Sequence, residues 1–151
     1  MSRTQAWARA GAVFAAVLVA DQLTKAIVRG SLEVGERRDL FPGIHAVRVR
    51  NEGIAFGLLG DSPTWLVVIV VVAALGGLLL FFALNVDRPY AWLATGLLLG
   101  GAAGNIIDRL ADGAVNDWIK LPHWPAFNLA DIAITLGVVA LVFAIDAPRG
   151  T

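Results

Sequence analysis

The chain has 151 residues, the length of one ordinary domain, and 58% of them are hydrophobic whereas only 16% are charged. Soluble domains carry about 25% charged residues, so this chain has too few charged groups to cover a water-facing surface, and we expect a membrane protein. Basic and acidic residues both number 12, which excludes a strongly basic nucleic-acid-binding protein. The absence of cysteine excludes disulfides, thiolate metal sites and a cysteine nucleophile, and two histidines are too few for a three-histidine zinc site.

Four apolar stretches approach the roughly 20 residues that a helix needs to cross the hydrocarbon core of a bilayer. They cover residues 7–28, 64–84, 90–107 and 129–145. Prolines stand where helices should begin, as at Pro63 and Pro89, and tryptophans lie near several span ends. Arg3 and Arg9 precede the first stretch as in a signal peptide, but no convincing small-residue cleavage site follows, so we expect this span to be retained.

The segment between the first two spans is too long and varied for a simple turn. Residues 47–50 alternate apolar and polar side chains with a period of two, which predicts a half-buried strand. Residues 51–53 predict a turn and residues 54–57 a second short strand, so we expect a small antiparallel sheet within residues 29–61, at one membrane surface. Residues 108–127 are expected to form a loop. The predicted architecture is a single all-α membrane domain, residues 1–151, with four transmembrane helices and this small sheet or flap between the first two.

Four spans place both termini and the short connection at residues 85–88 on one side of the membrane, and the two long loops on the other. The long loops carry more lysine and arginine, so the positive-inside rule taken literally places them in the cytoplasm. They also contain comparable numbers of carboxylates. Charge counting therefore leaves the orientation open.

Ionisable side chains in or beside a span are candidates for function, because their burial in lipid is costly. Asp21 and Lys25 lie four residues apart and can pair on one helix face, either as a self-neutralising pair or as an anchor for substrate. Asn105 and Asp108 share a face at the end of the third span. They predict either a hydrogen-bonded framework for a site or a helix terminus with a solvated Arg109.

Glycines recur every four residues in the third span, at Gly96, Gly100 and Gly104. Such a row of small residues lets another helix approach closely. The pattern therefore predicts that the third span packs tightly against a neighbour.

Two further carboxylates complete the set of candidates. Asp117 lies among apolar residues, and Asp131 lies in the first turn of the fourth span, which Asn128 can cap. Alternatively, Asp117 is a turn residue and Asp131 only complements the helix dipole. Two carboxylates held close together share a proton, so that one can activate water while the other polarises a carbonyl group. Spacing alone supports Asp108 with Asp131 as well as Asp117 with Asp131.

Two other functions fit parts of the same set. A magnesium-dependent lipid transferase would use Asp108, Asp117 and Asp131 as oxygen ligands. A small proton-coupled transporter would use Asp21, Lys25 and Asp131 as relay groups. Neither a His-Glu-x-x-His zinc motif nor a Gly-x-Ser-x-Gly serine hydrolase motif occurs in the sequence.

Five blocks of sequence, in order along the chain, resemble the lipoprotein signal peptidase (type II signal peptidase) family of bacterial membrane aspartyl proteases. They are DQLTK at 21–25, NEGIAFG at 51–57, GAAGNIIDR at 101–109, VNDWI at 115–119 and FNLAD at 127–131. Asn116 and Trp118 stand where the family more often has an apolar residue and phenylalanine.

The resemblance implies that Asp117 and Asp131 are the catalytic pair, with no metal or other cofactor. Lys25 joins the supporting candidates through its pairing with Asp21. The residues that the resemblance implies line or brace the site are Asp21, Asn51, Gly53, Asn105, Asp108, Arg109, Asn128 and Ala130.

The resemblance also implies a substrate and a location. The expected activity removes signal peptides from diacylglyceryl-modified prolipoproteins, just before the lipidated cysteine. The implied location is the bacterial inner membrane, with cytoplasmic termini, the active site near the extracytoplasmic face, and residues 29–61 as an external sheet and flap. We expect a monomer that contacts membrane lipid and binds no nucleic acid.

Overall fold

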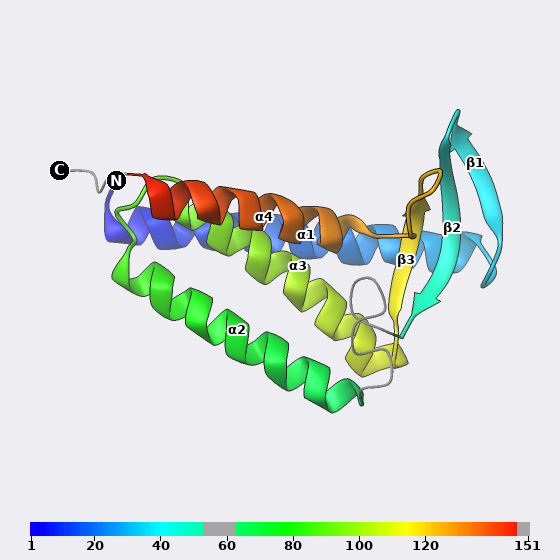
Figure 1. Ribbon diagram of the computed structural model, residues 1–151, viewed down its shortest axis with the longest axis horizontal. Helices are drawn as coiled ribbons and strands as arrows, with labels where there is room; N and C mark the ends of the chain where they lie inside the picture. The colour runs from blue at the N-terminus through cyan, green and yellow to red at the C-terminus, as the bar shows by residue number, and fades with distance from the viewer. Residues whose placement is uncertain (53–62, 148–151) are drawn as a thin grey trace.

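The computed structural model of the protein describes residues 1–52 and 63–147. Its elements, in chain order, are α1 (Arg3–Ser31), β1 (Arg37–Phe41), β2 (Ile44–Asn51), α2 (Thr64–Leu84), α3 (Ala91–Asp112), β3 (Val115–Lys120) and α4 (Leu129–Asp146). The helices run alongside one another, and the strands lie across one end of the bundle (Figure 1). The start of α1, the end of α4 and the α2–α3 connection lie at the other end of the bundle (Figure 1).

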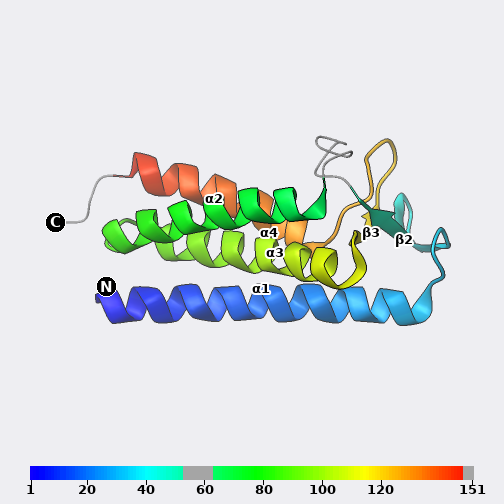
Figure 2. The same ribbon diagram turned by 90° about the horizontal axis from the view of Figure 1, so that it is seen from below.

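Three of the described helices are long and apolar enough to cross a membrane: α1, α2 from residue 65 onward, and α4. The stretch predicted as the third span does form a helix, but α3 is not in this set. Its glycines, together with Asn105 and Asp108, lower its mean hydropathy. α3 instead occupies the centre of the bundle, between α1 and α2 (Figure 2), and also packs against α4.

Close helix packing explains the glycines of α3, as their spacing predicts. Gly96, Gly100 and Gly104 face α1, where an added Cβ would collide with backbone or side-chain atoms. Gly101 faces α4, where a Cβ would lie 2.5 Å from the carbonyl oxygen of Ala130. By contrast, the backbone of α2 lies close to that of α3 alone among the described helices, and α2 meets α1 only near its C-terminal end, where Trp7 packs edge-on against Phe82 and Arg3 donates to the Ala83 carbonyl.

The sheet differs from the prediction in its composition. It has three antiparallel strands in the order β1-β2-β3, and β2 contains the predicted strand at residues 47–50. Its neighbours are β1 on one side and β3 on the other, with Asn51 opposite Val115 and Val49 opposite Asp117. The prediction of a loop at residues 108–127 was therefore wrong for residues 115–120. These residues form β3, whose backbone hydrogen-bond partners belong to β2, a strand distant in the sequence. The second strand predicted at residues 54–57 lies outside the described residues.

The end of α3 also corrects a prediction. The helix continues past residue 107 to Asp112 and ends at Gly113, whose positive φ of 73° suits glycine. Asp108 and Arg109 therefore project from helical backbone instead of following the helix. This extra turn carries the polar side chains of α3 up to the sheet.

Candidate active site

Asp131 is positioned by the start of α4. Asn128 is the N-cap, and its side-chain oxygen accepts a hydrogen bond from the backbone N–H of Asp131 at 3.0 Å. In return, Asp131 Oδ2 accepts the backbone N–H of Asn128 at 3.1 Å. This reciprocal capping box, with the cap predicted from the sequence, fixes the carboxylate at the positive end of the helix dipole.

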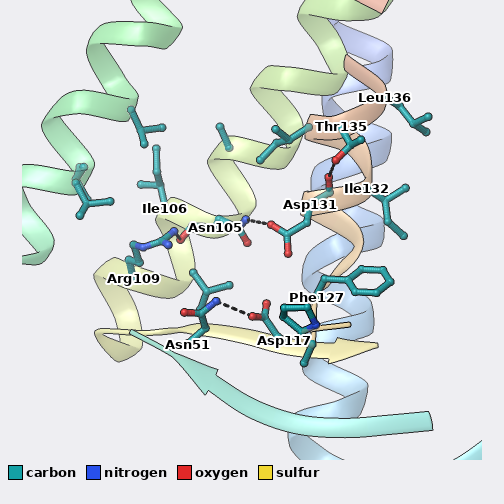
Figure 3. A pocket seen from close by; sticks show the side chains of 18 of the residues that line it. Asn51, Asn105, Ile106, Arg109, Asp117, Phe127, Asp131, Ile132, Thr135 and Leu136 are labelled. Carbon is teal, nitrogen blue, oxygen red and sulfur yellow. Dashed lines mark hydrogen bonds between the residues drawn. The ribbon is translucent and has the colours of Figure 1, made fainter. Parts of the chain in front are cut away.

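Asp117 projects from β3 and is 2% exposed. Its Oδ2 accepts a hydrogen bond from Asn51 Nδ2 at 2.9 Å, and its Oδ1 accepts one from Asn128 Nδ2 at 2.8 Å. The first of these bonds is drawn in Figure 3, where Asn51 approaches from the neighbouring strand. Since Asn128 contacts both Asp117 and Asp131, one residue links the two carboxyl groups.

Asn105, on α3, supports Asp131 from the other side. Its Nδ2 donates to Asp131 Oδ1 at 2.9 Å (Figure 3). Its oxygen accepts hydrogen bonds from Lys25 Nζ at 2.9 Å and Asn128 Nδ2 at 3.1 Å. Because Lys25 can only donate, the amide of Asn105 is oriented with its NH2 group toward Asp131.

The environment of Asp117 changes its proton affinity. The pKa of Asp117 is raised to about 6, chiefly by burial and also by the nearby charge of Asp131, and this is the net result after hydrogen bonds from Asn51 and Asn128 lower it in part. This carboxyl group therefore exchanges its proton in the mildly acidic range instead of near its usual value of about 4. A pKa raised in this way is typical of acids that transfer protons during catalysis.

Asp117 and Asp131 line the same cavity, of about 540 Å³. Asn51, Asn105, Arg109 and Thr135 also line its polar part, and Figure 3 shows Arg109 on the α3 side. The apolar residues that α2, α3 and α4 contribute to the lining are Val67, Val68, Val71, Ala102, Ile106, Ile132, Ile134 and Leu136. The two acids are therefore at one part of a largely apolar space between α2, α3 and α4.

Lys25 is the centre of a second polar group behind the cavity. Its ammonium lies 2.8 Å from Asp21, 3.2 Å from Asp108 and 2.9 Å from the Asn105 oxygen, so three acceptors surround its three N–H donors. The predicted pairing of Asp21 with Lys25 is confirmed, and both side chains are fully buried. Asp21 also accepts the backbone N–H of Ala130 at 3.0 Å, which ties α1 to the start of α4.

Asp108 belongs to this second group and is 1% exposed. Besides Lys25 it accepts the backbone N–H of Asn116 at 2.9 Å and the Gln22 amide at 3.2 Å, and Arg29 lies 3.6 Å away. Sequence reasoning did not select Gln22, Arg29 or Asn116. The available signal was that Gln22 is an uncharged polar residue beside Asp21 within an apolar stretch.

The two pairings that spacing left open are now distinguishable. Asp117 joins Asp131 at the cavity, whereas Asp108 faces Lys25 and is not part of the cavity lining. The three carboxylates of the magnesium hypothesis are thus not brought together, and within residues 1–52 and 63–147 no group of three or more acidic or histidine residues is placed to hold a metal ion. Asp21 and Lys25 do not line the cavity either, and Gly53 lies outside the described residues.

The chain is similar to known proteins in both sequence and fold. A family model described as signal peptidase (SPase) II matches residues 13–146. The lipoprotein signal peptidase of Moorella thermoacetica is 41% identical over 89% of this chain and 90% of its own, and that of Brevibacillus brevis is 40% identical over 86% and 90%. A solved structure described as a bacterial membrane enzyme superposes with a TM-score of 0.84 at 29% identity, covering 90% of this chain and 86% of that one.

Proposed function

This chain belongs to the signal peptidase II family of membrane peptidases, and from that premise we propose that it removes the signal peptides of diacylglyceryl-modified prolipoproteins. Cleavage falls at the peptide bond just before the lipidated cysteine. The observation that carries the proposal is that Asp117 and Asp131 line one cavity and that Asn128 links their carboxyl groups. An aspartic endopeptidase uses two carboxyl groups that face a common space, and these contacts support that role for Asp117 and Asp131.

Asp131 acts as the general base and Asp117 as the general acid in this proposal. Asp131 lies at the N-terminus of α4 and accepts hydrogen bonds from N–H groups of Asn128 and Asn105, whereas burial favours a proton on Asp117. Asp131 takes a proton from a water molecule as the oxygen attacks the carbonyl carbon, and Asp117 gives its proton to the carbonyl oxygen. The proton on Asp131 then passes to the amide nitrogen as the C–N bond breaks.

The cavity suits a substrate with an apolar helix and acyl chains. Its walls include valines of α2 and Ile132 and Leu136 of α4, so apolar segments can lie beside the acids without exposure to water. Arg109 and Asn51 stand at the polar part, where the peptide backbone would lie. Asn105 and Asn128 orient the acids, and Asp21, Lys25, Asp108 and Ala130 brace them.

The membrane arrangement in this proposal has four spans in the bacterial inner membrane. Both termini are cytoplasmic, and the sheet with the acid pair lies at the extracytoplasmic face. It is supported by three helices apolar enough to span and by the position of the sheet at the end opposite the termini. The protein works as a single monomeric membrane domain.

The test replaces each acid by its amide. We expect Asp117→Asn and Asp131→Asn to lower the rate of prolipoprotein processing by about 10²- to 10⁴-fold, because each removes a positioned proton-transfer group. Asp87→Asn is a matched control, since Asp87 is exposed in the α2–α3 connection at the opposite end. Normal processing by either cavity variant would exclude that residue from the pair.

A second arm separates the peptidase from the two other functions. Purified protein in detergent micelles, with excess chelator and no membrane potential, should still release the signal peptide. A chelator-sensitive reaction would favour the magnesium-dependent transferase, and the absence of cleavage would favour a transporter.

A further inference from the structure

The turn between β1 and β2 presents apolar side chains that the described protein does not cover. Phe41 is 71% exposed and Leu40 is 47% exposed, and Ile44, also exposed, stands opposite Phe41 across the turn. We refer to Leu40, Phe41 and Ile44 as the tip patch. Isolated exposed apolar residues are ordinary, but three of them at the end of a projecting hairpin indicate a contact with something apolar.

The position of the hairpin identifies the apolar partner. The strands run across the end of the helices, and the turn projects past α4 (Figure 1). α4 is apolar enough to span a membrane and exposes Val139, Val142 and Phe143, which do not line the cavity. In a bilayer, lipid would surround this face of α4 up to the end of the helix, and the β1–β2 turn would lie next to that lipid.

The segment that connects β3 to α4 contacts the β1–β2 turn and so holds the tip patch near α4. A Cβ on Gly43, in the turn, would lie 3.9 Å from Pro122 Cγ, so the turn touches the segment that leads from β3 into α4. The same segment carries Trp124, which is exposed, and tryptophan is enriched at the boundary between acyl chains and headgroups.

The charges behind the tip match a headgroup layer. Arg37 and Arg38 on β1 have side chains that are more than half exposed, and such cations reach the phosphate level while their stems cover apolar surface. Asp39 is also exposed, but it contacts His45 at 2.6 Å and lies 3.8 Å from Arg37. An apolar end followed by basic residues is the composition of an interfacial anchor.

We propose that the tip patch inserts into the headgroup region of the bilayer that α4 crosses, and that this insertion sets the depth of the sheet. β2 runs from the tip to Asn51, which holds Asp117 on the paired strand β3. The depth of the hairpin therefore sets the height of the acid pair relative to the leaflet. Only this last consequence rests on the proposed function.

The absence of cysteine from the sequence allows a direct measurement of depth. Phe41→Cys, labelled with an environment-sensitive fluorophore, is reconstituted into phosphatidylcholine–phosphatidylglycerol vesicles that contain lipids with a nitroxide near the headgroup. Val34→Cys is the matched control, because Val34 is also an exposed apolar residue but precedes the other end of β1. We expect blue-shifted emission and several-fold stronger quenching at position 41 than at position 34. Water-like emission with equal quenching at both positions would overturn the anchor.

A kinetic measurement tests the depth-setting role. The double variant Leu40→Ser, Phe41→Ser should raise KM several-fold for prolipoprotein embedded in vesicles and leave kcat and Tm unchanged. In detergent micelles, where no leaflet fixes the depth, its KM should equal that of the wild type. An unchanged KM in vesicles would overturn the depth-setting role, whereas failure of the wild type to cleave prolipoprotein would refute the proposed function and leave the depth measurement standing.

Discussion

Two groups of aspartates lie next to each other in this protein and differ in what surrounds them. Asp21 and Asp108 share the ammonium of Lys25, and all three side chains are at most 1% exposed. Asp117 and Asp131 are held by the neutral amides of asparagines and line a cavity. The Lys25 ammonium helps to lower the pKa of Asp108, whereas burial among neutral amides raises the pKa of Asp117 to about 6. The same residue type thus serves as a brace in one group and as a reactive acid in the other.

Asn105 connects the two groups. Its oxygen accepts from Lys25, and its NH2 group donates to Asp131. The charged group therefore orients the reactive one through a single amide. Loss of Lys25 should therefore disturb both groups of aspartates. The larger effect should fall on Asp21 and Asp108, whose charges Lys25 neutralises.

The largest expected difference between the groups appears when each loses one charge. Lys25→Met leaves Asp21 and Asp108 buried without their cation and should lower the free energy of unfolding by about 3–5 kcal/mol. Asp117→Asn turns an NH2 group toward one of the two amide donors, from Asn51 or Asn128, so the free energy of unfolding should fall by only about 1–3 kcal/mol while processing is lost. Thermal unfolding in detergent and a processing assay measure the two effects.

The comparison fails if the two variants behave alike. Equal losses of thermal stability would mean that Asp117 is as much a structural residue as Lys25. Asp87→Asn again serves as the control for the chemistry of the substitution, since Asp87 is exposed at the opposite end of the bundle.

Local sequence patterns predicted the helices better than they predicted the sheet. The apolar stretch predicted at residues 64–84 coincides with α2, and the glycine spacing anticipated the close contact between α3 and α1. β3 could not be predicted in this way, because Val115 and Asp117 pair with residues of β2 that lie more than 60 positions earlier. Pairing over such distances leaves no periodic signal in the strand itself.

The site was predictable as a set of residue types but not as an arrangement. Asp21, Lys25, Asn105 and Asp131 could be identified because a polar side chain within an apolar stretch is unfavourable in lipid and therefore indicates function. Spacing did not decide whether Asp108 or Asp117 joins Asp131, because the choice depends on the pairing of β3 and on the extra turn of α3. Resemblance to the family supplied that choice.

A smaller effect concerns the pH dependence of the reaction. Since burial raises the pKa of Asp117 to about 6, and the proposed mechanism needs its proton, kcat/KM of the free enzyme should fall as pH rises through this region. Asn51→Ala removes a hydrogen bond that favours the ionised form, so the pKa should rise and the fall in kcat/KM should move to higher pH.

The control for this shift is Asn85→Ala, since Asn85 bonds to the Phe81 carbonyl at the far end of the bundle. Its pH profile should match the wild type. A profile for Asn51→Ala that stays in place or moves to lower pH would mean that another group sets this limb of the profile.

The smallest effect tests whether helix contact holds the reactive group together. Gly101→Ala places a methyl group against the Ala130 carbonyl oxygen and Ile134, so α4 must move and the free energy of unfolding should fall by about 1–3 kcal/mol. Because Asp131 follows Ala130, the movement also lengthens its bond to Asn105, and kcat should fall. Gly76→Ala in α2, where an added Cβ meets no atom within 4 Å, should instead stabilise the helix by about 0.5–1 kcal/mol without changing kcat. If kcat of Gly101→Ala remained at the wild-type value, the asparagine amides alone would hold the acid pair, and the close approach of α3 to α4 would contribute only to packing.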